Sequence, residues 1–208
     1  QGLCTFYVGE IVYSQNREEE IILRVVAKRE PGYVLDVGAH DGRTNSNSLA
    51  LIERGWKAIL VEPSPFAFAK LLDLHGQNPR VTLVNATVGT ERRCVKFYEC
   101  QGDQYSTTRE DMAKLWETRG IKYRSYWVSQ ITVSELINEI GCGADILSID
   151  CEGVSFDILT SIPSAWSPSV IVVEHDSRAI EITGWAAAKG YEVIGLNAEN
   201  LLLMKVDK

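Results

Sequence analysis

The sequence predicts a single α/β domain with a Rossmann-like, mostly parallel seven-stranded sheet that ends in an antiparallel hairpin. Short apolar runs alternate with longer segments of helical pattern, which is typical of βα units joined by right-handed crossovers. The last two apolar runs, 191–196 and 201–206, are separated by four residues. Because a parallel crossover needs many more residues, these two runs must form a hairpin, and one strand of the sheet is reversed.

Five further runs supply the parallel part of the sheet. They read as continuous apolar stretches, as strands covered on both faces do. Helices are expected to follow the strands, with Pro65 suited to a first helical turn. The expected strands lie at 33–37, 58–62, 81–85, 145–150 and 170–174, and the expected helices at 46–54, 65–74 and 134–140.

We treat the whole chain, residues 1–208, as one domain, because a chain of this length buries a full core. Residues 1–30 are expected to be an N-terminal helical segment. A short strand is expected at 95–99. Residues 101–128 are polar, and we expect an irregular insertion over the top of the sheet with one helix from about 109 to 118.

Composition limits the partners of the protein. The formal net charge is -7, which disfavours nucleic acid because no surplus of basic residues would hold its phosphates. No run of 18 apolar residues is present, so we expect no membrane span, and no secretory leader is visible. The five cysteines form no C-x-x-C pair, which predicts free thiols and a cytoplasmic location.

The first strand runs into a loop from Asp36 to Gly42 that has glycines at 38 and 42. Ligands of open α/β sheets bind beyond the carboxyl ends of the strands, so we expect this loop to approach a ligand. Its spacing is G-x-x-x-G. A dinucleotide fingerprint would need glycines where His40 and Arg43 stand, so a dehydrogenase is disfavoured.

The charges of this region favour a different cofactor. Asp36 and Asp41 would repel a pyrophosphate, but they suit the sulfonium and ammonium of S-adenosylmethionine. Glu62 ends the second strand, where a carboxylate accepts hydrogen bonds from ribose hydroxyls. We therefore expect a class I methyltransferase domain, although Asp36 as a helix cap and the glycines as a simple turn remain the alternative. The predicted cofactor-binding residues are Gln15, Asp36, Gly38, Ala39, Asp41, Gly42, Glu62, Pro63, Asn85, Ala86 and Asp150.

Four segments resemble motifs of the FkbM family of methyltransferases. They are 34–42, the E-P-x-P stretch at 61–66, the I-D-x-E-G stretch at 147–153, and 13–19, which is similar to an S-Q-x-G-E-D stretch. The sequence departs from these motifs at His40, where the family often has Asn, at Arg17 for Gly, and at Glu19 for Asp. The resemblance covers roughly residues 12–176. It implies an O-methyltransferase that acts on a hydroxyl of a sugar, glycan or other small natural product.

Catalytic candidates lie at the ends of the fourth and fifth strands. An acceptor hydroxyl must lose its proton, so we expect Asp150, Glu152 and His175 to be catalytic, with His175 the best base by intrinsic pKa. Its alternative role is to bind backbone groups at a strand end. Asp150, Glu152, Glu174 and Asp176 are also candidate ligands for Mg²⁺, or else carboxylates that cap the following helix.

Two regions carry open alternatives. Gln15, Glu18 and Glu19 either close over the cofactor or form a solvated acidic face. Aromatic side chains in the 101–128 insertion either stack on an acceptor or pin the insertion to the core. The leading hypothesis is a small-molecule or glycan O-methyltransferase with this insertion near the acceptor. The alternatives are a nucleic-acid methyltransferase and a non-catalytic binding module on the same fold, and the oligomeric state is left open.

Overall fold

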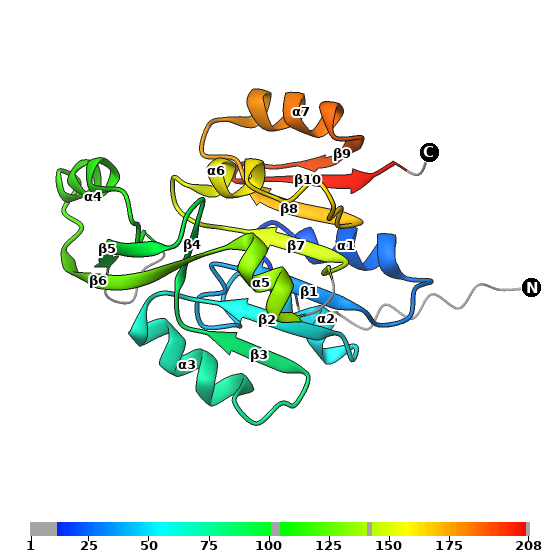
Figure 1. Cartoon of the computed structure of the whole chain (residues 1–208), viewed down its shortest axis with the longest axis horizontal. Helices are drawn as coiled ribbons and strands as arrows, with labels where there is room; N and C mark the ends of the chain where they lie inside the picture. Colours follow the sequence, from blue (N-terminus) through cyan, green and yellow to red (C-terminus); the bar gives the residue numbers. More distant parts are fainter. Residues whose placement is uncertain (1–11, 101–104, 141–142, 207–208) are drawn as a thin grey trace, which may run out of the picture.

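A computed structural model describes residues 12–100, 105–140 and 143–206. Its main sheet has seven strands in the order β3-β2-β1-β7-β8-β10-β9 (Figure 1). The first five strands are parallel, and β10 is antiparallel to both of its neighbours, so the predicted sheet and hairpin are confirmed. The strands are β3 (Val81–Val84), β2 (Lys57–Val61), β1 (Tyr33–Val37), β7 (Ile146–Ile149), β8 (Val170–Glu174), β10 (Asn200–Lys205) and β9 (Tyr191–Leu196).

Helices cover both faces of this sheet. Successive residues of β1 point to opposite faces. Val34 belongs to the core under α1, α2 and α3, Leu35 belongs to the core under α5, α6 and α7, and both are fully buried. No described helix is both long and apolar enough to cross a membrane. The helices are α1 (Glu18–Val26), α2 (Leu49–Glu53), α3 (Pro65–His75), α5 (Val133–Ile140), α6 (Ser155–Thr160) and α7 (Ala179–Ala188).

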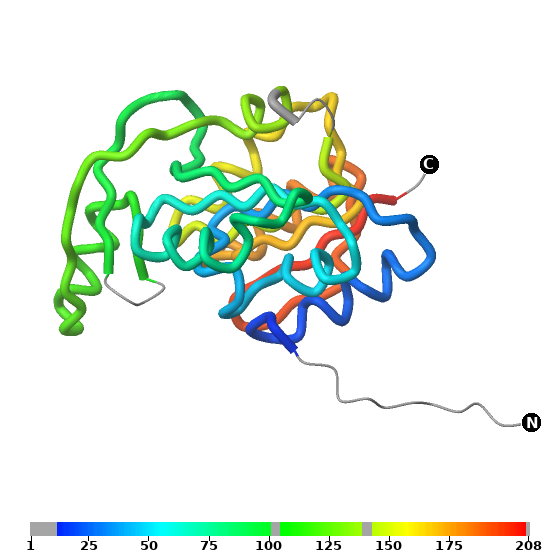
Figure 2. The backbone as a smooth tube through the Cα atoms, turned by 90° about the horizontal axis from the view of Figure 1, so that it is seen from below, coloured from blue at the N-terminus to red at the C-terminus, as the bar shows by residue number. Residues whose placement is uncertain are grey.

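A second, three-stranded sheet has the order β4-β6-β5. It is formed by β4 (Thr87–Gly89), β5 (Arg93–Cys100) and β6 (Tyr123–Thr132), and α4 (Glu110–Glu117) accompanies it. In Figure 1, β5, β6 and α4 extend to the left of the main sheet. The backbone view from below shows the same extension (Figure 2).

The second sheet corrects the prediction of an irregular 101–128 insertion, although the predicted helix is present as α4. Residues 123–128 belong to β6, which pairs with β5 from Arg93↔Gln130 to Cys100↔Tyr123. Polar residues on the exposed face of β6 interrupt its apolar pattern, so the strand signal is weak. Residues 1–11 and 101–104 of the predicted N-terminal segment and insertion lie outside the described residues.

The loop before α2 is longer than predicted, because polar side chains form hydrogen bonds with its backbone and delay the start of the helix. Asp41 accepts hydrogen bonds from the backbone of Arg43 and Thr44 at 2.9 and 2.7 Å. Ser46 Oγ accepts one from Leu49 N at 3.0 Å, so the helix begins at Leu49 rather than at residue 46. Cys94 and Cys151 carry free thiols, as predicted, and Cys4 and Cys142 lie outside the described residues.

Candidate active site

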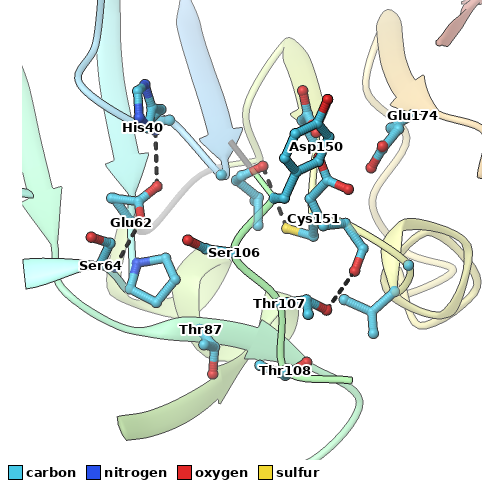
Figure 3. Close-up of a pocket in the computed structure, with 18 of the residues that line it drawn as sticks. His40, Glu62, Ser64, Thr87, Ser106, Thr107, Thr108, Asp150, Cys151 and Glu174 are labelled. Carbon is cyan, nitrogen blue, oxygen red and sulfur yellow. Dashed lines mark hydrogen bonds between the residues drawn. The ribbon is translucent and has the colours of Figure 1, made fainter. Parts of the chain in front are cut away.

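A pocket with a cavity volume of about 570 Å³ lies at the carboxyl ends of β1, β2 and β7 and reaches the second sheet (Figure 3). This volume suits a ligand of nucleoside size. Most of the predicted site residues line it, although their roles in binding remain predictions. The lining includes Gln15, Asp36, Gly38, Ala39, Glu62, Pro63, Ala86, Asp150, Glu152, Glu174 and Asp176, but not Asp41, Gly42, Asn85 or His175.

Both glycines of the β1 loop are also restricted by the packing of the protein itself. A Cβ on Gly38 would lie 1.8 Å from the carbonyl oxygen of Asp150, and one on Gly42 would lie 2.5 Å from Cδ1 of Leu71. Both glycines also have positive φ, 89° and 73°. The protein's own packing therefore requires them, and Gly38 brings the β1 loop against the end of β7.

His40 adopts a positive φ of 49°. Asn is among the residues that tolerate this conformation best, which accounts for the Asn of the family motif. The turn also aims the His40 N–H at Glu62 Oε2, at 2.9 Å. This hydrogen bond joins the β1 loop to the end of β2, together with those that Gly38 N and Ala39 N donate to Val61 O at 2.9 and 3.0 Å.

Asp41 and Asn85 are predicted cofactor-binding residues that the structure does not bring to the pocket. Asp41 is occupied by the backbone of its own turn. Asn85 Nδ2 donates to the carbonyl oxygens of Glu62 and Pro63, at 2.8 and 3.2 Å. Both side chains therefore shape loops that line the pocket, because nearby backbone groups are closer partners than a ligand.

Glu62 follows the last residue of β2 and is buried, with 6% of its surface exposed. Its two oxygens accept hydrogen bonds from His40 N at 2.9 Å and from Ser64 N at 2.8 Å. Burial raises the pKa of Glu62 to about 7 against the effect of these two donors, and the charges of Asp150 and Glu99 add to the rise. Each oxygen can accept another hydrogen bond from a ligand.

Asp36 and Asp150 lie near each other at the ends of adjacent strands. Asp36 is buried and accepts a hydrogen bond from Ser48 Oγ at 2.5 Å. Burial raises the pKa of Asp36, and burial together with the Asp36 charge raises the pKa of Asp150 to about 6. Neither carboxylate forms an ion pair with a described residue, so both attract a positively charged ligand.

Asp150 also belongs to a cluster of three carboxylates. Asp150, Glu152 and Glu174 each offer one oxygen, and these oxygens lie within 4.8 Å of one another. Burial, and then the charges of Asp150 and Glu152, raise the pKa of Glu174 to about 10. An all-oxygen donor set of this kind fits a hard divalent cation such as Mg²⁺.

Asp176 was a fourth candidate metal ligand, but it does not belong to this cluster. Both of its oxygens accept hydrogen bonds from Gly153 N, at 3.1 Å each. It thereby supports the turn that follows β7, which carries Glu152. The capping role that we considered for these carboxylates describes Asp176 well.

His175 does not face the pocket. Neighbouring residues at the end of a strand point to opposite sides, and Glu174 takes the pocket side. The His175 Nδ1 accepts a hydrogen bond from Ser177 N at 3.1 Å, while its backbone N–H donates to Glu199 O at 2.8 Å. The structure therefore favours the local backbone role of His175 over that of a catalytic base.

The N-terminal turn is not a solvated acidic face. Glu18 and Glu19 are 1% and 3% exposed, and both bind neighbouring polar groups. Arg17 stands where the family motif has glycine, and its φ of 66° explains that preference. Gln15 projects from this turn and lines the pocket.

The segment 105–109 crosses the pocket and is tied to the turn after β7. Thr107 Oγ1 donates to Glu152 O at 2.8 Å, and Arg109 donates to Gly153 O at 3.1 Å (Figure 3 shows the first). Trp116 stacks on Tyr105 with 4.5 Å between ring centroids, and both residues line the pocket. Lining residues that the sequence did not single out as site residues include Thr44, Asn45, Ser46, Asn47, Ser64, Phe66, Thr87, Phe97, Cys100, Thr108, Met112 and Cys151.

The sequence could have indicated that the polar residues 44–47 line the pocket, because they follow the first motif on the ligand side of the sheet. Nothing in the sequence indicated Phe97 or Thr87, since they reach the pocket from the second sheet. Long-range pairing of β4, β5 and β6 brings them there.

Solved structures support the fold. Methyltransferase PaMTH1 from Podospora anserina, bound to S-adenosylhomocysteine, is 11% identical, has a TM-score of 0.52, and aligns over 93% of this chain and 80% of its own. A putative RNA methyltransferase, PH1948 from Pyrococcus horikoshii, is 13% identical with a TM-score of 0.49, covering 91% of this chain and 81% of its own. Precorrin-6y C5,15-methyltransferase from Geobacter metallireducens is 12% identical with a TM-score of 0.49, covering 94% and 92%.

No curated protein sequence gives a significant match. The family described as "Methyltransferase FkbM domain" matches residues 36–193. This range includes the β1 loop, Glu62, and the turn after β7. Because the match spans well over half of its length, the chain belongs to the FkbM methyltransferase family.

Proposed function

We propose that this protein transfers a methyl group from S-adenosylmethionine to a hydroxyl of a small molecule or glycan. The observation that carries the proposal is one continuous pocket with Glu62 at the end of β2 and with Asp36 and Asp150 at the ends of β1 and β7. Glu62 is suited to a ribose diol, and the other two carboxylates are suited to a cation. S-adenosylmethionine has both groups on one molecule.

The order of the strands orients the cofactor. Pro63 and Ala86 line the pocket on the side of β2 and β3, which is where the adenine ring would lie. The ribose would bind Glu62. The sulfonium and ammonium would then lie toward β1 and β7, close to Asp36 and Asp150.

Asp150 is the group best placed to accept the acceptor's proton. When bound, the cofactor supplies a methyl group whose carbon–sulfur bond breaks, with the electron pair left on sulfur, as the acceptor oxygen bonds to carbon. With its pKa raised to about 6, Asp150 is mostly ionised at neutral pH and can take the hydroxyl proton. Glu174, with its pKa raised to about 10, would be protonated and would donate a hydrogen bond to Asp150, which favours the ionised form of Asp150.

Asp150, Glu152 and Glu174 are also the residues that would hold a divalent cation. Such an ion would lower the pKa of a coordinated acceptor hydroxyl and neutralise the cluster. Asp176 would not take part, because its oxygens are bound to Gly153. Activity with and without a chelator distinguishes a direct carboxylate base from a metal-assisted one.

The charge of the pocket disfavours a nucleic-acid acceptor. Seven Asp and Glu side chains line the pocket, against two Arg side chains. Both guanidiniums are already paired, Arg109 with Asp111 and Arg178 with Glu181. A phosphate backbone would therefore meet repulsion without a free cation to offset it.

The proposal is tested with S-adenosylmethionine labelled in its methyl group. We expect label to pass to members of a panel of glycans and small hydroxylated natural products, and not to RNA. Parallel reactions with EDTA, and with Mg²⁺ restored, measure the metal dependence. Methylation of RNA alone, or calorimetry that detects no binding of S-adenosylhomocysteine, would contradict the proposal.

A further inference from the structure

Glu18 joins two parts of the chain that are distant in sequence. Its carboxylate accepts hydrogen bonds from Asn16 N, Asn197 Nδ2 and Asn200 Nδ2, each at 2.8 Å. The first donor belongs to the N-terminal turn, and the other two belong to the tip of the β9–β10 hairpin. Because Glu18 is 1% exposed, water does not compete for these bonds, and the turn is fixed to the hairpin.

A second link strengthens this connection. Asn16 Nδ2 donates to Glu199 Oε2 at 2.7 Å, so the residue next to Gln15 holds a residue of the hairpin tip. Glu19 closes the turn from the other side by accepting hydrogen bonds from Tyr13 N at 2.5 Å and Ser14 N at 3.2 Å. The residues on both sides of Gln15, Ser14 and Asn16, are therefore fixed by hydrogen bonds.

Gln15 itself is exposed, lines the pocket and has no hydrogen bond to a described residue. Its carboxamide offers two donor hydrogens that no described residue accepts. The family match begins at Asp36, after this turn. The resemblance of residues 13–19 to a family motif predicts that Gln15 binds the cofactor, but it gives neither the group that Gln15 binds nor a positioning role for Glu18.

A neutral hydrogen-bond donor such as the Gln15 carboxamide matters in this pocket, because the methionine moiety of the proposed cofactor carries a carboxylate. Seven acidic side chains line the cavity, and its two guanidiniums are paired with carboxylates. The ammonium group of the cofactor has acidic partners in Asp36 and Asp150, but its α-carboxylate must find neutral donors. Gln15 and the polar loop 44–47 supply them on the β1 side of the pocket.

We infer that Gln15 binds the α-carboxylate of the cofactor and that Glu18 is the positioning residue that holds Gln15 there. The inference rests on the proposed binding of S-adenosylmethionine. It assigns the N-terminal turn to the recognition of the amino-acid end of the cofactor, separately from the nucleoside end at Glu62.

Two ligands separate these ends. S-adenosylhomocysteine carries the amino-acid group, whereas 5′-methylthioadenosine keeps the nucleoside and lacks that group. We expect Gln15→Ala to raise the dissociation constant of S-adenosylhomocysteine about tenfold to hundredfold, as the loss of one hydrogen bond to a charged group does. The affinity for 5′-methylthioadenosine, measured by calorimetry, should stay within about twofold. Glu18→Gln should shift the same ligand selectively.

Glu20→Gln is the matched control, because Glu20 lies on the same helical turn and pairs with Arg17 instead. It should leave both affinities unchanged. Equal losses for the two ligands in Gln15→Ala, or no loss, would overturn the inference while the proposed function stands. A wild-type protein that binds neither ligand would overturn both. If Glu18→Gln fails to fold, the exposed Gln15 variant still decides the contact; if it folds and binds like wild type, the positioning role is wrong.

Discussion

Replacing Glu62 with alanine is the most informative perturbation of the pocket, because this carboxylate has both a structural and a binding role. It accepts hydrogen bonds from His40 N and Ser64 N, at 2.9 and 2.8 Å, and it is buried. Glu62→Ala therefore leaves two backbone donors without their acceptor, in addition to removing the proposed contacts with the ribose. Stability and affinity should both fall, for separate reasons.

The magnitudes follow from these contacts. Loss of the two proposed ribose hydrogen bonds to a charged group should cost about 3–6 kcal/mol of binding free energy, which raises the dissociation constant of S-adenosylhomocysteine about 10²- to 10⁴-fold. The two backbone N–H groups left unpaired should together cost about 2–6 kcal/mol of folding free energy. For a chain of this size, that lowers Tm by about 4–24 °C.

Calorimetry with S-adenosylhomocysteine, at a temperature where the variant is folded, measures the binding loss. Asp145→Ala is the control. Asp145 also accepts a backbone hydrogen bond, from Tyr33 N at 2.9 Å, but it lies at the amino ends of the parallel strands, away from the pocket. This control should lower Tm and leave affinity unchanged. A folded Glu62→Ala protein with wild-type affinity would refute the ribose assignment, and equal affinity losses in both variants would trace the effect to destabilisation.

Three further predictions concern catalysis and pH. Asp150→Asn should lower turnover at saturating S-adenosylmethionine by about 10²–10⁴-fold, and it should also weaken cofactor binding because a charge beside the ammonium is lost. His175→Ala should turn over at the wild-type rate, and a slow His175 variant in a methyl-transfer assay would show that His175 acts in the site. Glu174→Gln should raise the free energy of unfolding by about 1–3 kcal/mol near pH 8. Folding raises the pKa of Glu174 from 4.5 to about 10, so the wild type loses stability as the pH rises through that range. Equal urea midpoints for Glu174→Gln and the wild type at pH 8 would contradict the prediction. Affinity for S-adenosylhomocysteine should weaken as the pH falls through about 7, where Glu62 gains a proton, and a flat calorimetric profile across that range in the wild type would count against its role.

Much of the fold could be predicted from local patterns. The apolar runs marked all seven strands of the main sheet, and the four residues 197–200 between the last two runs were too few for a parallel crossover, so a hairpin was required. The motif residues Gly38, Glu62 and Asp150 were found because each lies at or just beyond the end of a buried strand, and parallel strands end at one edge. The family was also evident from these motifs, and the match over residues 36–193 confirms it.

The second sheet could not be predicted in the same way. β6 is half-solvated, and its partners β4 and β5 lie far from it along the chain, so neither periodicity nor spacing marks their pairing. Phe97 therefore reaches the pocket by a route that the sequence does not display.

The sequence by itself determined the order of strands and the set of polar residues that lie near their ends. Only the tertiary structure decided which of those side chains face the pocket. Asp41 and Asn85 bind nearby backbone groups outside the pocket, and His175 is turned away by the alternation of its strand. Asp176 and Gln15 line the pocket, although Asp176 also binds Gly153 N. The physical reason is that a hydrogen bond depends on distance and direction in space. Those quantities are fixed by packing between distant segments, which residue type and spacing alone do not specify.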